Sequence, residues 1–426
     1  MTEEKIATLI SLYEDVIPKS RDTESFLLEI LTACDGSVKN ASLMLNESLG
    51  VARKVDCNIG KRKRDTGNSD NRCYKVQKSL NQFIEDDAKK FRPISADRRA
   101  KTSNRAIELF SKEDVESTIG YVTMHEKALP EEFANSLLRQ LMDDLEGFAP
   151  YEFHLFGNKC SSNHTSKKYS SDPAILDGRD KIYYNNRRGT VYEYNDLLKA
   201  TQLLIEDIVN ETIKKFKPLP FQISSPNWKG DVVLVNKYGK SDHLMWHSDR
   251  LTSIGPQPIV ASLSLGCVRE FRIRRCYPSD SQIYVVRPPH NSLIIMHAGF
   301  QEEYRHSVHQ QTNNRATNLH PISKDVRFNL TYRDYLKKYI TNAPRCPKCD
   351  NPMDLRRAFK DPERRGQYIW QCSSHYSGVE CGGVRLADFN RNSLVVEKNA
   401  GEGSRWLADD DWEAKEAQKN GTELPR

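Results

Sequence analysis

A series of short segments between residues 232 and 333 constrains the fold of this chain most tightly. The segments are rich in β-branched and aromatic residues, several alternate apolar with polar side chains, and turn-forming residues lie between them. They are residues 232–235, 259–266, 270–274, 292–296 and 328–332. Many short strands separated by turns favour a β-sandwich or a β-barrel.

Two histidines and one aspartate within this stretch have the pattern of a non-haem iron site. His247 and Asp249 are spaced as His-x-Asp, and His306 follows later in the chain. Two histidines and a carboxylate occupy one face of an octahedron and leave the opposite face open for substrate and O₂. A His-x-Asp triplet alone often arises by chance in a surface turn. The strands around this one favour the metal site.

The last strand of the stretch carries two rows of side chains. Successive side chains on a strand point to opposite faces, so its polar and apolar residues separate. The polar row is Arg327, Asn329, Thr331 and Arg333, and the apolar row is Phe328, Leu330 and Tyr332. Inside a barrel, the arginines would supply fixed positive charge for a small dicarboxylate such as 2-oxoglutarate. The alternative is an exposed edge strand with solvated arginines.

These residues resemble the AlkB family of Fe(II)/2-oxoglutarate dioxygenases, over roughly Gly120 to Tyr335. The matching pieces are Asn236-x-Tyr238, Trp246-His247-Ser248-Asp249, residues 262–266, Tyr304-x-His306-Ser307 and Arg327-x-Asn329-x-Thr331-x-Arg333. The resemblance implies a double-stranded β-helix, or jelly roll, with flanking helices. In one departure, many family members carry acidic residues directly after His-x-Asp, where this chain has Arg250 and Leu251.

The resemblance also implies roles for single residues. His247, Asp249 and His306 would bind Fe(II). Arg327 would pair with the far carboxylate of 2-oxoglutarate with help from Asn236 and Tyr238, while Asn329 and Arg333 would support its metal-chelating end. The implied activity is oxidative demethylation of N-alkylated DNA bases, which releases succinate, CO₂ and formaldehyde. The alternatives are an RNA or protein demethylase or hydroxylase of the same fold, and a non-catalytic adaptor that binds DNA or ubiquitin.

Contacts with an alkylated base in single- or double-stranded DNA are expected near residue 190. A buried iron is reached only by a flipped-out or single-stranded base, which stacks on an aromatic ring. By its place in the family pattern, Tyr194 is the first choice for this ring and Tyr192 the second. Arg187 and Arg188 would hold phosphates. The alternatives are core tyrosines of a hairpin and a solvated basic loop.

Four cysteines near the C-terminus predict a second metal site. They are Cys346, Cys349, Cys372 and Cys381, and a closed four-ligand zinc site would fold a segment too small for its own core. The segment resembles a GRF-type zinc finger, which implies binding of single-stranded DNA, with Trp370 and the neighbouring Arg364 and Arg365 on the binding surface. His375 in place of one cysteine is an alternative, and a pair of disulfides is another.

The N-terminal residues 1–50 predict a module of three short helices, because apolar residues recur at helical spacing. The segment resembles a CUE or UBA module, which implies ubiquitin binding. Val16-Ile17-Pro18 stands where the CUE family has Met-Phe-Pro, and Met44-Leu45 where it has a di-leucine. A three-helix bundle with another partner is the alternative.

Residues 51–105 are rich in charge and poor in apolar side chains, which predicts a disordered basic linker. Its cluster at 61–64 has the composition of a nuclear import signal, so we expect a nuclear location. Residues 77–84 resemble a PCNA-interacting box, with Gln77, Leu80 and Phe83 in place. A solvated charge run and a chance match are the alternatives.

The predicted architecture is a mixed α and β, multidomain chain of 426 residues. A dioxygenase domain would occupy residues 106–342, the zinc finger 343–392 and a polar tail 393–426. The net charge of +6 favours an acidic partner. No apolar run approaches the roughly 18 residues of a membrane span. We expect a monomer.

Overall fold

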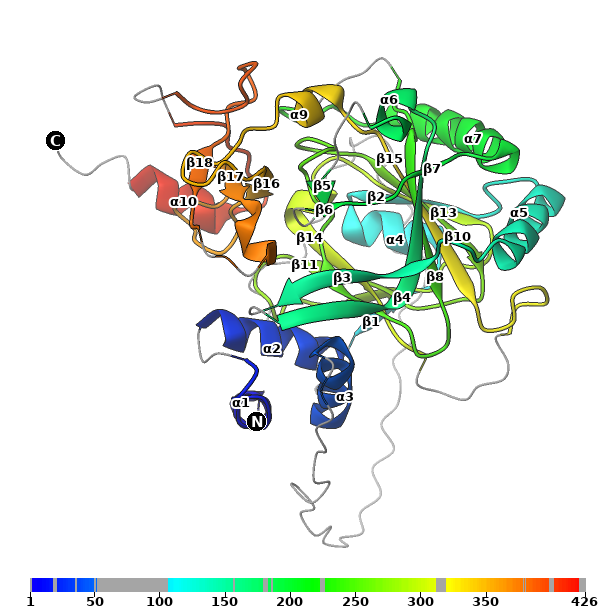
Figure 1. The fold of residues 1–426 in the computed structure, drawn as a ribbon, viewed down its shortest axis with the longest axis horizontal. Helices are drawn as coiled ribbons and strands as arrows, with labels where there is room; N and C mark the ends of the chain where they lie inside the picture. Colours follow the sequence, from blue (N-terminus) through cyan, green and yellow to red (C-terminus); the bar gives the residue numbers. More distant parts are fainter. Residues whose placement is uncertain are drawn as a thin grey trace, which may run out of the picture.

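A computed structural model gives the fold of this chain (Figure 1). It describes residues 2–17, 21–34, 37–49, 51, 106–155, 158–178, 183–184, 187–222, 227–311, 319–377, 379, 381–397 and 402–420. The predicted nuclear import cluster at 61–64 and the PCNA-like box at 77–84 lie outside the described residues.

Two β-sheets packed face to face form the centre of the molecule. The larger contains β2 (Val122–His125), β3 (Ala149–Leu155), β4 (Asn158–Ser170), β7 (Tyr192–Glu193), β8 (Val232–Tyr238), β10 (Val260–Gly266), β13 (Ser292–Met296) and β15 (Arg327–Arg333). The smaller contains β1 (Ile107–Leu109), β9 (Leu244–His247), β11 (Phe271–Arg275), β12 (Tyr284–Val286) and β14 (Tyr304–Val308). Apolar side chains of both sheets meet in one buried cluster, as expected of a jelly roll.

The strand orders show how distant segments come together. The larger sheet has the order β2-β13-β10-β15-β8-β4-β3 with β7 beside β4, and the smaller has β1-β12-β11-β14-β9. The five strand segments predicted from sequence are confirmed as β8, β10, β11, β13 and β15. β15 pairs with β8 so that Asn329 faces Asn236 and Arg327 faces Tyr238. Residues far apart in sequence therefore share one inner face.

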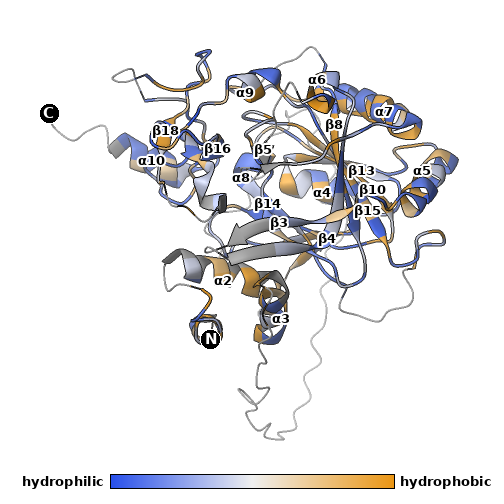
Figure 2. Cartoon of the chain, in the orientation of Figure 1, coloured by the Kyte–Doolittle hydropathy of each residue, from blue (hydrophilic) through white to orange (hydrophobic). Residues whose placement is uncertain are grey.

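Helices cover the outer face of the larger sheet. α5 (Glu131–Asp143) and α7 (Asp196–Ile213) pack on its apolar row, which includes Phe328, Leu330 and Tyr332 as predicted. Apolar and polar residues mix along both helices in Figure 2, as expected for helices with one buried and one solvated face. Short helices complete the domain: α4 (Lys112–Ile119), α6 (Pro173–Leu176), α8 (Phe300–Glu303) and α9 (Lys337–Thr341). No helix in the described part of the chain is long and apolar enough to cross a membrane.

Local sequence explains where these helices begin. Asn195 caps α7 by accepting a hydrogen bond from the backbone N–H of Leu198. At α4, Ser111 and Asp114 exchange hydrogen bonds in a capping box, and the helix ends at Gly120 with a positive φ of 72°. The capped start of α7 fixes the helix that backs the larger sheet.

The N-terminal segment folds into α1 (Thr2–Leu12), α2 (Arg21–Ala33) and α3 (Val38–Leu49) around its own apolar core. Three helices were predicted there. Ile17, Met44 and Leu45, which the CUE resemblance placed on a ubiquitin-binding surface, are all buried in this core. Figure 1 shows the helices (blue) beside β3 and β4. Met245 of β9 packs against the helical core, so the module also contacts the barrel.

The C-terminal region forms a cysteine module around a sheet of β16 (Met353–Arg357), β17 (Tyr368–Cys372) and β18 (Val384–Leu386), followed along the chain by α10 (Trp412–Asn420). A 3₁₀ helix, η3 (Ser373–Ser377), follows β17, and a separate two-stranded sheet joins β5 (Tyr183–Tyr184) to β6 (Arg187–Arg188). The module core extends past the predicted boundary at 392 and includes Leu394, Trp406 and Ala408. Residues 402–420 are therefore folded onto the module, whereas the sequence suggested only a polar tail.

Candidate metal centre and substrate cavity

The two histidines and the aspartate of the predicted metal site come together on the smaller sheet. His247 ends β9, His306 lies in β14, and the two residues are cross-strand partners. Their ring centroids are 4.2 Å apart. With Asp249, each offers one ligand atom, and these atoms all lie within 4.8 Å of one another. Strand pairing therefore brings three ligands to one point.

Asp249 is held from two sides. Its Oδ2 atom accepts hydrogen bonds from Nε of Arg333 at 2.9 Å and from Nη2 at 2.8 Å. Its backbone N–H donates to Oε1 of Gln301 at 2.7 Å. Burial is the largest single influence and raises the pKa of this carboxyl, but the charges of Arg333, His306 and His247 and the hydrogen bond from Arg333 together lower it below its ordinary value. The other oxygen, Oδ1, lies 3.8 Å from Nε2 of His247 and is placed to bind a metal.

Both histidines favour the neutral, metal-binding form. Nδ1 of His247 donates to the carbonyl of Met245 at 2.9 Å, which leaves the lone pair on Nε2. Burial lowers the pKa of His247, and it lowers that of His306 to about 3. Nδ1 of His306 is buried without a hydrogen-bond partner among the described residues. Two neutral imidazoles and one carboxylate oxygen fit a divalent iron ion.

The predicted dicarboxylate-binding residues lie on β8 and β15. Arg327 is 1% exposed, and its Nη2 atom donates to Ser264 Oγ at 2.9 Å and Asn329 Oδ1 at 3.0 Å. Its Nε and Nη1 atoms and Oδ1 of Asn236 are buried without partners among the described residues. Burial lowers the pKa of Arg327 to about 10, so the guanidinium stays charged at neutral pH. A buried cation with unused donors fits an anionic cosubstrate, because such a group is costly unless paired.

A cavity of about 790 Å³ opens beside these groups. Residues of the polar row of β15, the metal-ligand triad, Asn236 and Tyr238 line it. Arg327 is not among the lining residues and lies behind Asn329, to which it donates a hydrogen bond. The site residues predicted from sequence on β8, β9, β14 and β15 therefore surround one space, with Arg327 at its back.

The predicted base-stacking residues lie elsewhere. Tyr194 is 2% exposed, packs in the core beneath α7 and donates to the carbonyl of Gly230 at 2.8 Å. This corrects the expectation for Tyr194 in favour of a core tyrosine. Tyr192 packs against Tyr169 and Lys167 and is not among the residues that line the cavity. Arg187 and Arg188 form β6, and their side chains lie outside what the structure describes.

The predicted nucleic-acid surface on the cysteine module is also corrected. Trp370 is fully buried, and its indole N–H donates to the carbonyl of Leu394 at 2.8 Å. Arg365 is buried as well and pairs with Asp411 at 3.1 Å. These two side chains join the module sheet to residues that follow it in the chain. Of the predicted surface, only Arg364 is exposed.

The departure at residues 250 and 251 now has a structural reason. Leu251 is buried in the apolar core of the cysteine module. The guanidinium of Arg250 lies 4.4 Å from the ring centroid of Tyr376 and 3.9 Å from the carboxylate of Asp354, both in the module. The two positions after the metal ligand therefore dock the module onto the barrel. Sequence analysis noted the departure but did not connect it with the module.

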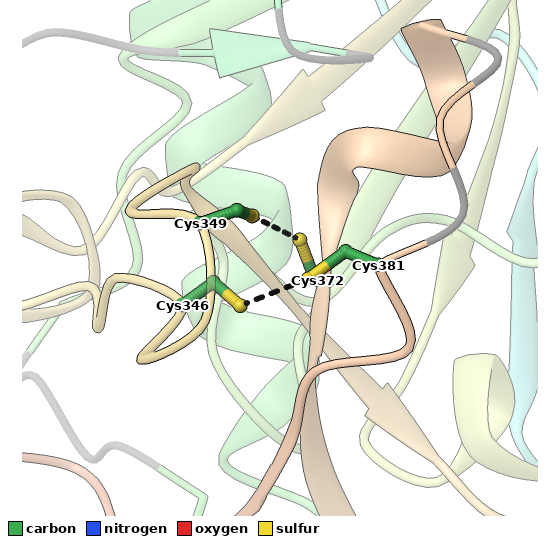
Figure 3. A group of neighbouring side chains, drawn as sticks. All are labelled: Cys346, Cys349, Cys372 and Cys381. Atoms are coloured by element: carbon green, nitrogen blue, oxygen red, sulfur yellow. Dashed lines mark hydrogen bonds between the residues drawn. The ribbon is translucent and has the colours of Figure 1, made fainter.

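The four cysteines form a second cluster (Figure 3). Cys346 and Cys349 lie on one loop, facing Cys372 and Cys381. The sulfur atoms are 3.5 Å apart in the pair Cys346–Cys381 and 3.4 Å in the pair Cys349–Cys372. A disulfide would require about 2.05 Å. The four ligand atoms lie within 4.8 Å of one another, a set that can hold one metal ion. The His375 side chain lies outside what the structure describes.

Gly383 gives this cluster its space. A Cβ atom at residue 383 would collide with Sγ of Cys346. The backbone N–H of Cys372 donates to the carbonyl of Gly383 at 2.8 Å, which holds the glycine against the cluster. Glycine at this position therefore allows four sulfur atoms to converge.

Comparisons with known proteins agree with this geometry. The family model of the 2OG-Fe(II) oxygenase superfamily matches residues 121–333. The chain is 25% identical over 203 residues to DNA oxidative demethylase ALKBH2 of Arabidopsis thaliana, which covers 42% of this chain and 55% of that protein. It is 34% identical over 109 residues to alpha-ketoglutarate-dependent dioxygenase alkB homolog 3 of Homo sapiens, which covers 24% of this chain and 35% of that protein.

The chain therefore spans about half the length of the first of these relatives and about a third of the second. Among solved structures, OsALKBH1 matches with a TM-score of 0.36 and 19% identity, over 50% of this chain and 97% of that chain.

Proposed function

The chain belongs to the 2OG-Fe(II) oxygenase superfamily, and from this premise we propose that it removes N-linked alkyl groups from DNA bases. The observation that carries the proposal is the set of three metal ligands and the Arg333–Asp249 pair on one cavity, with the buried Arg327 bonded to the lining residue Asn329. The likeness to DNA oxidative demethylase ALKBH2 supports DNA as the substrate.

The proposed chemistry divides between the bound groups and the chain. Iron with 2-oxoglutarate and O₂ would supply oxidative decarboxylation to succinate and CO₂ coupled to hydroxylation of the alkyl carbon, and a hydroxylated N-methyl group then leaves as formaldehyde. Arg333 holds Asp249 in its ligating orientation, and the Met245 carbonyl holds the tautomer of His247. Arg327 would neutralise the far carboxylate of the cosubstrate.

A single-turnover experiment tests this proposal. The protein is loaded with Fe(II) and 2-oxoglutarate without oxygen, given a single-stranded oligonucleotide with 1-methyladenine or 3-methylcytosine, and then exposed to air. We expect the oligonucleotide to lose the mass of its methyl group while succinate and formaldehyde form. Succinate without a change in the oligonucleotide would move the substrate to RNA or protein. If iron is bound but neither succinate nor a demethylated oligonucleotide forms, the chain would be a non-catalytic adaptor.

We further propose zinc as the metal of the four-cysteine cluster. Four thiolates that converge on one point are the ligand set of structural zinc sites. Metal analysis of the purified full chain should find one zinc per molecule, and loss of that zinc in Cys349→Ser would assign it to this cluster. A full chain that carries one iron and no zinc would contradict the assignment.

Nuclear location and recruitment through ubiquitin and PCNA remain parts of the proposal that rest on sequence. The basic residues 61–64 support nuclear import. Because Ile17, Met44 and Leu45 are buried, a ubiquitin surface would use other side chains of the helical module. Titration of the full chain with ubiquitin and with PCNA tests each partner. Phe83→Ala should weaken the binding of PCNA and leave the binding of ubiquitin unchanged.

A further inference from the structure

One wall of the catalytic cavity belongs to the cysteine module. The wall is formed by β16 and the loop after it, through Asp354, Leu355, Arg356, Arg357 and Phe359. The same cavity is lined on the barrel side by His247, Asp249 and His306. The module therefore lines the same cavity as the metal ligands.

Hydrogen bonds fix this wall to the barrel. Thr252 donates through Oγ1 to Oδ1 of Asp354 at 3.2 Å and accepts from the backbone N–H of Leu355 at 3.1 Å. Arg357 donates to the carbonyl of Glu302 and to the carboxylate of Glu303, both at 2.8 Å. Hydrogen bonds from both ends of β16 therefore join the module to the barrel. They give β16 a defined position relative to the metal ligands.

The charges of the wall favour an anion. Arg250 and Arg356 both approach the single carboxylate of Asp354, each at 3.9 Å, so one positive charge of these three side chains is left unbalanced. The Arg356 side chain is 39% exposed and donates to the hydroxyl of Tyr376, while its buried Nε atom has no partner among the described residues. Next to it, Phe359 lies 5.3 Å from the guanidinium of Arg305. Guanidinium groups beside an aromatic ring suit a phosphodiester and its neighbouring base.

We propose that this wall is a substrate-binding subsite, in which Arg356 contacts a backbone phosphate next to the target base and Phe359 contacts the adjacent nucleotide. The inference rests on the proposed function, because it takes the substrate to be a nucleic acid. In this proposal the module contacts the substrate inside the catalytic cavity. The alternative is that the module binds nucleic acid on its outer surface, where Arg364 is exposed.

Arg356→Ala and Arg364→Ala form a matched pair, since each removes one positive charge from the same module. Affinity for an unmodified single-stranded oligonucleotide is measured on the full chain by fluorescence anisotropy at several salt concentrations. We expect Arg356→Ala to weaken binding about five- to tenfold and to lower the salt slope by about 0.7. Arg364→Ala should change affinity less than about twofold. The opposite ranking, or no effect of Arg356→Ala, overturns the inference.

Two further measurements separate this inference from its premise. Arg356→Lys should recover most of the salt slope, and its failure to do so while folded overturns a phosphate contact. Iron content and the thermal unfolding midpoint should be equal in wild-type protein and all three variants, because the metal ligands are unchanged, so any loss of binding is not a loss of folding. A wild-type protein that forms succinate but binds no oligonucleotide overturns the proposed function and this inference with it. Wild-type binding that Arg356→Ala leaves intact overturns the inference alone.

Discussion

The two clusters of metal-ligating side chains are built in different ways. His247 and His306 are cross-strand partners in a sheet, and Asp249 is held by hydrogen bonds with Arg333 and Gln301. The four cysteines lie largely in loops at the edge of a three-stranded sheet. The barrel therefore preorganises its ligands by backbone pairing, whereas we expect the module to depend on the proposed zinc to keep its four thiolates together. Loss of each metal should accordingly have a different consequence.

Removal of zinc should have the largest effect on stability. We expect Cys372→Ser to lower the free energy of unfolding of the module by more than about 5 kcal/mol, because structural zinc contributes roughly 10–16 kcal/mol in zinc-finger peptides. Loss of the module core would expose Trp370 and Trp406, so tryptophan emission should shift to longer wavelength. Zinc added back to chelated wild-type protein is the control. An unchanged melting curve for Cys372→Ser would remove the contrast between the clusters.

Loss of an iron ligand should abolish turnover without unfolding the barrel. His247→Ala removes one ligand and leaves Arg333 paired with Asp249, so no buried charge is stranded. We expect turnover to fall more than about 100-fold, since changes even in groups behind a metal ligand cost 10- to 100-fold. His125→Ala, which removes a half-buried histidine of β2 hydrogen-bonded to Thr212 and away from the metal ligands, is the matched control. Full activity of His247→Ala would contradict the metal assignment.

A buried carboxyl in the barrel makes the stability of the barrel depend on pH, in the direction opposite to that expected for the cysteine module. Burial raises the pKa of Asp231 to about 8, so the folded state keeps a proton that the unfolded state has lost above about pH 4. Its contribution to stability is full below pH 4 and is lost as the pH rises to 8. Zinc binding to thiolates has the opposite sign, because protons must leave the ligands.

Asp231→Asn tests this carboxyl, since the amide oxygen can still accept from the backbone N–H of Tyr335. Between pH 5 and pH 7 we expect the variant to gain about 2 kcal/mol relative to wild type, measured by denaturant unfolding at each pH. Asp143→Asn, at the exposed end of α5, should show no such trend. A difference between variant and wild type that does not change with pH would show that Asp231 is ionised in the fold.

The barrel site was largely predictable because its information is local. Alternation along residues 327–333 separates Arg327 from Phe328 whatever lies around the strand, and the His-x-Asp spacing places two ligands together. Trp370 and Tyr194 were misplaced because an aromatic residue in a short strand, or directly after one, fits a core and a surface equally well. Their positions depend on Leu394 and Gly230, which are distant in sequence. The cavity wall at Arg356 was missed for the same reason, although Arg250 and Leu251 were a signal.

The smallest effect predicted for the barrel site concerns the cosubstrate, and it depends on how much of the site is formed before ligands bind. The Nη2 atom of Arg327 donates to Ser264 and Asn329, and its Nε and Nη1 atoms are buried without partners in the described structure. Arg327→Ala should therefore raise the apparent KM for 2-oxoglutarate at least about tenfold, since a lost charge-assisted pair is worth more than about 1.4 kcal/mol. Arg327→Lys should recover only part of this affinity, because lysine lacks the planar fork that binds a carboxylate through two bonds.

The control for this variant has to be an arginine outside the site. Arg269→Ala is a poor control, since Arg269 is buried and donates to three backbone carbonyls. Arg287→Ala is a suitable control, because Arg287 is half-exposed and lies on the rim of the smaller sheet. An unchanged KM in Arg327→Ala, with iron still bound, would mean that the cosubstrate uses another cation and that this arginine serves only to hold Asn329 in place.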